Sequence, residues 1–221
     1  MKAGKRKFLS KTLFAFFVLC ISAVTYGNII YDFHIFNDPK YEADLRLNFT
    51  VTVSDEGQNK VGFLFENSGS ISSSITAIYF DDDSVLNIAD NILEGQGVNF
   101  SFGATPKSLP AGNNLTPPFA KTPAFSTDSD SPTSHNGINP DEWLKITFTL
   151  KIGKDFDDVI DAISRGGTTS QNDLRIGLHI QSLPCDDSVS AINCIIPVPI
   201  PEPATICLLA IGSLAFIKKK R

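Results

Sequence analysis

Residues 146–152 read Ile146-Thr147-Phe148-Thr149-Leu150-Lys151-Ile152, with an apolar side chain at every second position. Successive side chains of an extended strand point to opposite faces, so this alternation predicts a strand with one buried face and one exposed face. The same pattern fills residues 45–53, where polar residues separate Leu45, Leu47, Phe49, Val51 and Val53. Two such stretches predict an antiparallel sheet that packs one face on a core.

Outward from these stretches, short strand-like segments recur along the chain. Ser54–Asn59 is a cluster of turn-forming residues, which predicts a hairpin between the strands on either side of it. We expect the other strands at 61–67, 75–80, 98–103, 144–152 and 174–181, with an edge strand near 29–36. The sequence therefore predicts an all-β fold: an antiparallel β-sandwich or jelly roll with one short helix.

That helix is expected at residues 155–164. Its apolar side chains fall on one helical face, its first turn is acidic, and Gly166-Gly167 follows it as a stop signal.

A different region, Ala104–Asp141, is rich in Pro, Ser, Asn and Gly and predicts a long loop. Phe119 and Phe125 lie within this loop, and we expect them to pack it onto the domain.

Charge is distributed unevenly over the 221 residues. Of 19 cations, five precede Asn28 and four stand at residues 218–221, whereas all 24 acidic residues lie between these two basic ends. The intervening body, with ten cations, has a formal charge near −14. A surface of that sign repels phosphate backbones, so we expect no nucleic-acid partner.

Residues 1–27 are typical of a signal peptide. A basic segment ends at Lys11, the apolar segment Leu13–Ile21 follows, and small residues then precede a cleavage site after Ala23 or Gly27. An uncleaved anchor is the alternative, but the apolar segment is short against the roughly 20 residues of a membrane span. Cys20 raises a lipoprotein alternative, which Leu19 disfavours because a small residue is needed before the modified cysteine.

The C-terminal segment, residues 196–221, has three parts. Alternating prolines keep its beginning extended and accessible to a protease, and they lead to the motif Pro201-Glu202-Pro203-Ala204-Thr205. The apolar residues 206–217 predict a helix about 20 Å long, short of a bilayer core of about 30 Å and hence a weak membrane anchor. The basic residues Lys218, Lys219, Lys220 and Arg221 then act as a stop. With both basic ends cytoplasmic, the body between them lies outside.

This three-part tail resembles the PEP-CTERM sorting signal. The resemblance covers about 25 residues and implies recognition by exosortase, an integral-membrane protease or transpeptidase, in bacteria that often make exopolysaccharide. It implies an exported protein that is anchored in the membrane only until the tail is processed. A plain proline-rich linker before a tail anchor is the alternative. The body is also similar to exported PEP-CTERM proteins of unassigned activity in segments 75–81, 137–140 and 174–181, and that likeness implies no chemistry.

Two cysteines, Cys185 and Cys194, lie in the expected domain at residues 28–195. Because the protein is expected in an oxidising compartment, we predict a disulfide between them, with two free thiols or a metal site as alternatives. A loop of about ten residues closed in this way would contribute on the order of 2–3 kcal/mol.

Candidate sites for chemistry are few. Asp81, Asp82 and Asp83 follow a predicted strand and are the best metal candidates, for Ca²⁺, against a solvated acidic turn; Asp128 and Asp130 could contribute. The three histidines have no metal-protease spacing, and neither a Gly-x-Ser-x-Gly elbow nor a phosphate loop is present. We therefore expect no enzymatic activity and no required cofactor.

These features favour a non-catalytic, exosortase-sorted protein of the cell surface or extracellular matrix (biofilm), associated with exopolysaccharide. The second hypothesis is a carbohydrate-binding module in which aromatic rings stack on sugars, the candidates being Phe119, Phe125, Tyr79 and Trp143, although each could instead belong to the core. The third is a secreted hydrolase, which needs a nucleophile and a base, or two carboxylates, meeting in a cleft.

Overall fold

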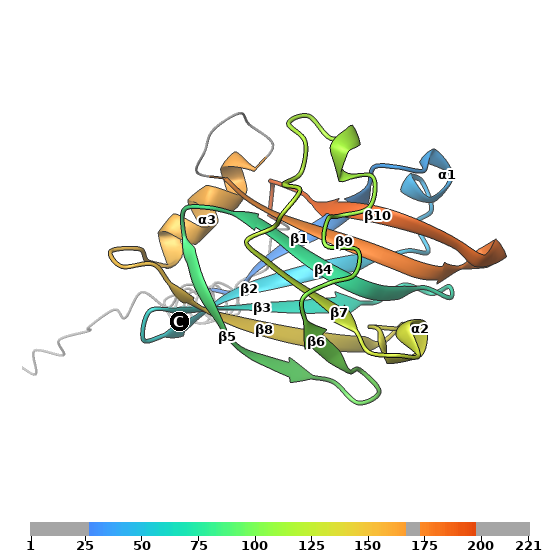
Figure 1. Ribbon diagram of the computed structural model, residues 1–221, viewed down its shortest axis with the longest axis horizontal. Helices are drawn as coiled ribbons and strands as arrows, with labels where there is room; N and C mark the ends of the chain where they lie inside the picture. The colour runs from blue at the N-terminus through green and yellow to red at the C-terminus, as the bar shows by residue number, and fades with distance from the viewer. Residues whose placement is uncertain (1–26, 167–172, 198–221) are drawn as a thin grey trace, which may run out of the picture.

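The structure is a computed structural model and describes residues 27–166 and 173–197. Within these ranges ten strands pair in antiparallel fashion in one continuous sheet (Figure 1). They are β1 Ile29–Ile35, β2 Phe49–Gly57, β3 Lys60–Asn67, β4 Ser74–Asp82, β5 Leu86–Glu94, β6 Phe100–Phe102, β7 Phe125–Ser129, β8 Glu142–Leu150, β9 Leu174–Leu183 and β10 Asp187–Asn193. The all-β prediction is confirmed.

The sheet folds over into two layers that share β1. Ile29–Asp32 pair with β2, whereas Phe33–Ile35 pair with β10. One layer has the order β5-β8-β3-β2-β1, and the other has the order β1-β10-β9-β4-β7-β6. The expectation that residues 29–36 form an edge strand was wrong: this strand has a neighbour on both sides, and its inward side chains Tyr31 and Ile35 are buried.

The predicted β2–β3 hairpin is present, but its first strand begins and ends later than predicted. Gln58 and Asn59 form the turn with φ of 52° and 61°, the left-handed pair of a two-residue hairpin loop. Phe49 rather than Leu45 begins the strand, and Leu45 is fully exposed. The physical reason lies in the local turn that Asp44 forms, because its carboxylate accepts hydrogen bonds from the backbone and the guanidinium of Arg46.

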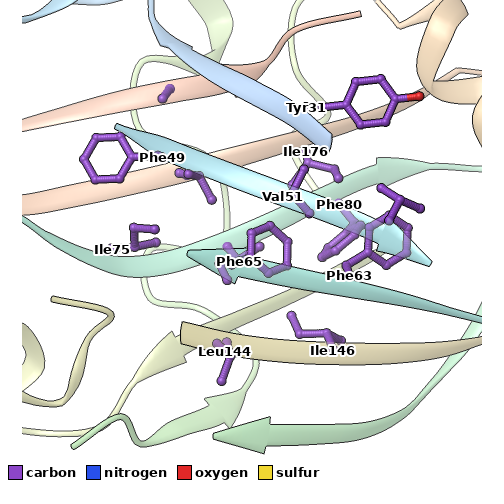
Figure 2. Close-up of a cluster of buried hydrophobic side chains, with 14 of the residues drawn as sticks. Tyr31, Phe49, Val51, Phe63, Phe65, Ile75, Phe80, Leu144, Ile146 and Ile176 are labelled. Carbon is purple, nitrogen blue, oxygen red and sulfur yellow. The ribbon is translucent and has the colours of Figure 1, made fainter. Parts of the chain in front are cut away.

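Aromatic rings fill the space between the layers. Phe80 of β4 contacts Phe63 of β3 and Phe148 of β8 at centroid distances of 5.1 and 4.9 Å. Figure 2 shows Phe63, Phe65 and Phe80 beside Ile176 of β9, all inside this core. The strands predicted from alternation thus supply the inward rings on which the two layers meet.

Helix α3, Phe156–Arg165, lies over one end of the layered sheet (Figure 1). Asp155 caps it, because its carboxylate accepts from Asp158 N while the Asp158 carboxylate accepts from Asp155 N. Its apolar face, with Phe156, Val159 and Ile163, is buried in the core, as its spacing predicted. Short single-turn helices occur at α1 Pro39–Glu42, η1 Gly112–Asn114, α2 Thr133–Asn136 and η2 Pro184–Asp186.

The outward face of β4 and β9 lies under a long segment, residues 104–124, here called the cover loop. Leu109 and Phe119 of this loop form a second buried cluster with Ala77, Tyr79 and Ile192. The expectation that Phe119 packs the loop down is therefore confirmed. The predicted loop 104–141 is more structured than expected, since it also contains β7 and α2.

Candidate functional site

A pocket of about 630 Å³ lies at the edge of the cover loop, on the outward face where β1 meets β10. Asp32 and His34 line it from β1, and Ile192 and Cys194 line it from β10 and its end. Leu115 and Thr116 of the cover loop form another wall, and Arg175 of β9 also lines it. A pocket of this size with apolar walls and a few polar groups is the default place to look for a ligand.

The register of β1 and β10 brings a thiol and an imidazole together in this pocket. Phe33 pairs with Asn193, and Cys194 N donates to Asp32 O at 2.8 Å, so Asp32 and Cys194 are cross-strand neighbours. His34 lies two residues beyond Asp32 on the same face of β1. Cys194 Sγ is 3.9 Å from His34 Nδ1. Alternation along both strands thus places three polar side chains on one wall.

The electrostatics keep this thiol and imidazole neutral. Partial desolvation at the pocket wall lowers the pKa of His34, against a smaller opposing effect of Glu42. Burial also raises the pKa of Cys194, and the charge of Asp32 raises it further. An activated cysteine needs the opposite shift, because the thiolate is the nucleophile. At neutral pH the pair is therefore a resting thiol beside a neutral imidazole.

Arg175 lines the pocket, but its guanidinium is hydrogen-bonded to other groups of the protein. Nε and Nη2 donate to Asp81 Oδ2, and Nη1 and Nη2 donate to the carbonyls of Pro117 and Pro118 at 2.7 and 2.8 Å. The Phe119 ring lies 5.4 Å from the guanidinium carbon. Arg175 is buried and neutralised by Asp81, so it ties the cover loop to the sheet and is poorly placed to bind an anion.

The predicted Cys185–Cys194 disulfide was wrong. Both cysteines are free, with Cys185 exposed in the turn η2 and Cys194 half-buried beyond β10. The whole of β10 separates them, and a seven-residue strand spans roughly 20 Å at about 3.3 Å per residue. A disulfide requires Cα atoms within about 7 Å. The sequence between the cysteines had been interpreted as a loop, and it is a strand.

The predicted calcium site at Asp81, Asp82 and Asp83 was also wrong. Asp81 binds Arg175, whereas the Asp82 carboxylate accepts from the backbone of Ser84, Val85 and Leu86 and so shapes the β4–β5 turn. Neighbouring residues of a strand point to opposite faces, which separates these two carboxylates. In the described ranges no three His, Cys, Asp or Glu side chains are grouped as a metal site, and Asp128 instead accepts from Thr105 N.

The aromatic residues proposed for sugar stacking are placed differently from one another. Tyr79 and Phe119 are buried under and within the cover loop, and Phe125 packs on Phe80 and Phe148. Trp143 is half-buried on β8. Because its neighbour Leu144 points into the core, Trp143 points away from it. Only Trp143 of the four therefore retains a position from which it could meet a sugar ring.

The sorting motif Pro201–Thr205 and the basic stop Lys218–Arg221 lie outside the described residues, as does the signal peptide as far as Tyr26. None of the helices in the described ranges is long and apolar enough to span a bilayer. Among the described residues the final strand is β10, which ends at Asn193, and the motif follows it closely in the sequence.

Cys194 was predicted only as a disulfide partner and no site was predicted at the histidines, so the contact between Cys194 and His34 was not predicted. Residues 187–193 carry only a weak strand signal, in which Ser190 separates Val189 from Ala191, and the expected disulfide loop concealed it. Comparisons of this chain with protein-family models, curated proteins and solved structures found no match.

Proposed function

We propose that this chain is an exported bacterial protein that exosortase sorts to the cell surface or the extracellular matrix. The observation that carries the proposal is the order of its segments: a basic and apolar start, an acidic body, the motif Pro201–Thr205, an apolar segment and a basic stop. Within the described ranges the strands of the body run from Ile29 to Asn193, between the two proposed signals.

The proposed role of the body is structural: a non-catalytic module associated with exopolysaccharide. The pocket favours this over a hydrolase, because its one nucleophile–base contact, among the residues that line it, is a neutral thiol beside a neutral imidazole. The charge of the body supports the same role, since like charges on an acidic domain oppose its self-association.

A carbohydrate-binding module is the second candidate, and one observation favours it. Trp143 stands on the outward face of β8, next to Glu66 of β3 in register, and Glu66 in turn pairs with Thr50 of β2. The indole rests on Gly95, where an added Cβ would lie 3.3 Å from Nε1. The ring therefore has a carboxylate as its direct cross-strand neighbour, with the Thr50 hydroxyl one strand farther away, and such a face offers stacking and hydrogen bonds to a sugar.

Intact mass tests the sorting proposal. The protein is recovered from the cell surface and medium of the producing bacterium, with the exosortase gene present and deleted. The expected result is loss of the leader in both strains and loss of the tail containing Lys218–Arg221 only when exosortase is present. A mass that keeps this tail in both strains would overturn sorting and leave a tail-anchored protein.

A matched pair of variants localises the signal. Glu202→Ala changes the motif, whereas Pro199→Ala changes the same proline-rich stretch outside it. We expect processing to stop only in the first variant.

Binding to the host's own exopolysaccharide tests the second candidate, and affinity electrophoresis measures it. Trp143→Ala should abolish the retardation of the protein by the polysaccharide. Phe102→Ala removes an exposed ring on the edge strand β6 and should leave the retardation unchanged.

A further inference from the structure

The Cys194 thiol and the His34 imidazole have no role in holding the described fold together. Their only side-chain hydrogen-bonding contact with the described residues is the one with each other. His34 is exposed, Cys194 is half-buried, and both line the pocket, so a ligand could approach the pair without disturbing the core.

The distance between the two donor atoms fits a shared metal ion. Typical metal–sulfur and metal–nitrogen bonds are about 2.3 and about 2.0 Å. Bonds of those lengths place the two donors about 3.5 Å apart at a tetrahedral angle and about 4.3 Å apart in a linear arrangement. The observed separation of 3.9 Å between Cys194 Sγ and His34 Nδ1 falls between these limits.

We propose that Cys194 Sγ and His34 Nδ1 bind a soft cation, Cu(I), at the wall of the pocket. Thiolate ligands select Cu(I), whereas Ca²⁺ and Mg²⁺ require several oxygen ligands. Structural Zn²⁺ takes four ligands, and no third His, Cys, Asp or Glu in the described ranges joins the pair in a metal-binding group. An ion that is satisfied by two ligands therefore fits this site best.

The surroundings of the pair favour such an ion. Asp32, the cross-strand neighbour of Cys194, supplies a negative charge beside the bound cation. Ile192 and Leu115 supply apolar walls of the same pocket. Binding replaces the thiol proton, which passes to solvent, and leaves the oxidation state of the copper unchanged. This inference is independent of how the protein is sorted.

The test uses the full chain in detergent with Cys20, Cys185 and Cys207 changed to Ser, so that Cys194 is the only thiol. Cu(I) is titrated against a chromophoric Cu(I) chelator under anaerobic conditions. A matched protein keeps Cys185 instead and carries Cys194→Ser, which presents an exposed thiol in a turn without a histidine contact. A third protein adds His34→Gln to the parent.

We expect the parent to bind one equivalent of Cu(I) and the other two proteins to bind it at least roughly tenfold more weakly, since losing even an outer-shell partner of a metal site costs about 10–100-fold. X-ray absorption of the copper-loaded parent should show one sulfur and one nitrogen donor. Equal affinity of the parent and the His34→Gln protein, or a copper site without nitrogen, would overturn the proposal. Because the absorption measurement needs no variant, the proposal remains testable if one of the variants misfolds.

Discussion

Gly177 of β9 lies beneath Leu109 of the cover loop. A Cβ added at this position would be 2.6 Å from Leu109 Cδ2 and 3.0 Å from Cδ1, closer than packed carbon atoms come. A larger residue here would have to displace the Leu109 side chain from the face of the sheet. Leu109 is buried, so its side chain has little freedom to turn away.

We expect Gly177→Ala to lower the free energy of unfolding by about 1–3 kcal/mol, the usual cost of overpacking. Urea unfolding measures it. The double variant Gly177→Ala/Leu109→Ala should lose less than the sum of the two single changes, because the second change removes the clash. Strict additivity of the two changes would contradict the contact.

His179 is a residue whose titration should affect stability. It lies on β9, and burial lowers its pKa below the ordinary value of 6.5. The unfolded chain therefore binds a proton more readily than the folded chain does. The contribution to stability is complete above pH 6.5 and declines as the pH falls through 6.5 toward the lowered pKa.

We therefore expect the free energy of unfolding to fall between about pH 8 and about pH 5, and to fall less in His179→Gln. Urea unfolding at both pH values measures the difference. His34 titrates with the same sign, so the comparison is between wild type and variant rather than between pH values alone. An identical decline in both proteins would show that His179 does not carry the effect.

At the scale of single elements, the stability of helix α3 depends on its capping box. Asp155→Ala removes the carboxylate that accepts a hydrogen bond from Asp158 N. We expect this loss to lower the free energy of unfolding by about 1 kcal/mol. Asp161→Ala is the control, since it removes an exposed carboxylate from the middle of the same helix. Thermal unfolding followed by circular dichroism should separate the two. Equal loss in both variants would mean that general charge, rather than the cap, stabilises the helix.

The cover loop depends on Arg175 in a comparable way. Lysine keeps the charge of arginine but lacks the planar fork that reaches Asp81, Pro117 and Pro118 together. We expect Arg175→Lys to let trypsin cut after the exposed Lys107 and Lys121 at least roughly tenfold faster, the factor given by about 1.4 kcal/mol of lost tethering. Arg46→Lys, which alters an exposed ion pair with Asp44 elsewhere, should leave the rate unchanged.

At the scale of the whole molecule, the sheet topology keeps Cys185 and Cys194 apart. We expect an oxidised sample of the folded protein to show no Cys185–Cys194 link by peptide mass analysis. Alkylation near neutral pH should label the exposed Cys185 faster than Cys194, whose thiol is half-buried and has a raised pKa. A Cys185–Cys194 linked peptide from folded protein would mean that β10 is not formed as described.

Much of the fold was predictable because alternation survives in strands with one exposed face. β3, β8 and β9 and the helix α3 lie close to their expected positions. β5, β7 and β10 were missed for different reasons: bulges break the alternation of β5, proline-rich sequence surrounds β7, and a supposed disulfide loop concealed β10. The candidate site was missed with β10, since the Cys194–His34 contact exists only once that strand pairs with β1.

The sequence by itself determined the class of fold, the cap and apolar face of α3, and the acidic body between two basic ends, because each depends on residues close together along the chain. Only the tertiary structure decided which strands are neighbours, that β1 joins both layers, that the cover loop buries Phe119, and that Cys194 meets His34 rather than Cys185. Those outcomes depend on long-range strand pairing, which local side-chain patterns do not specify.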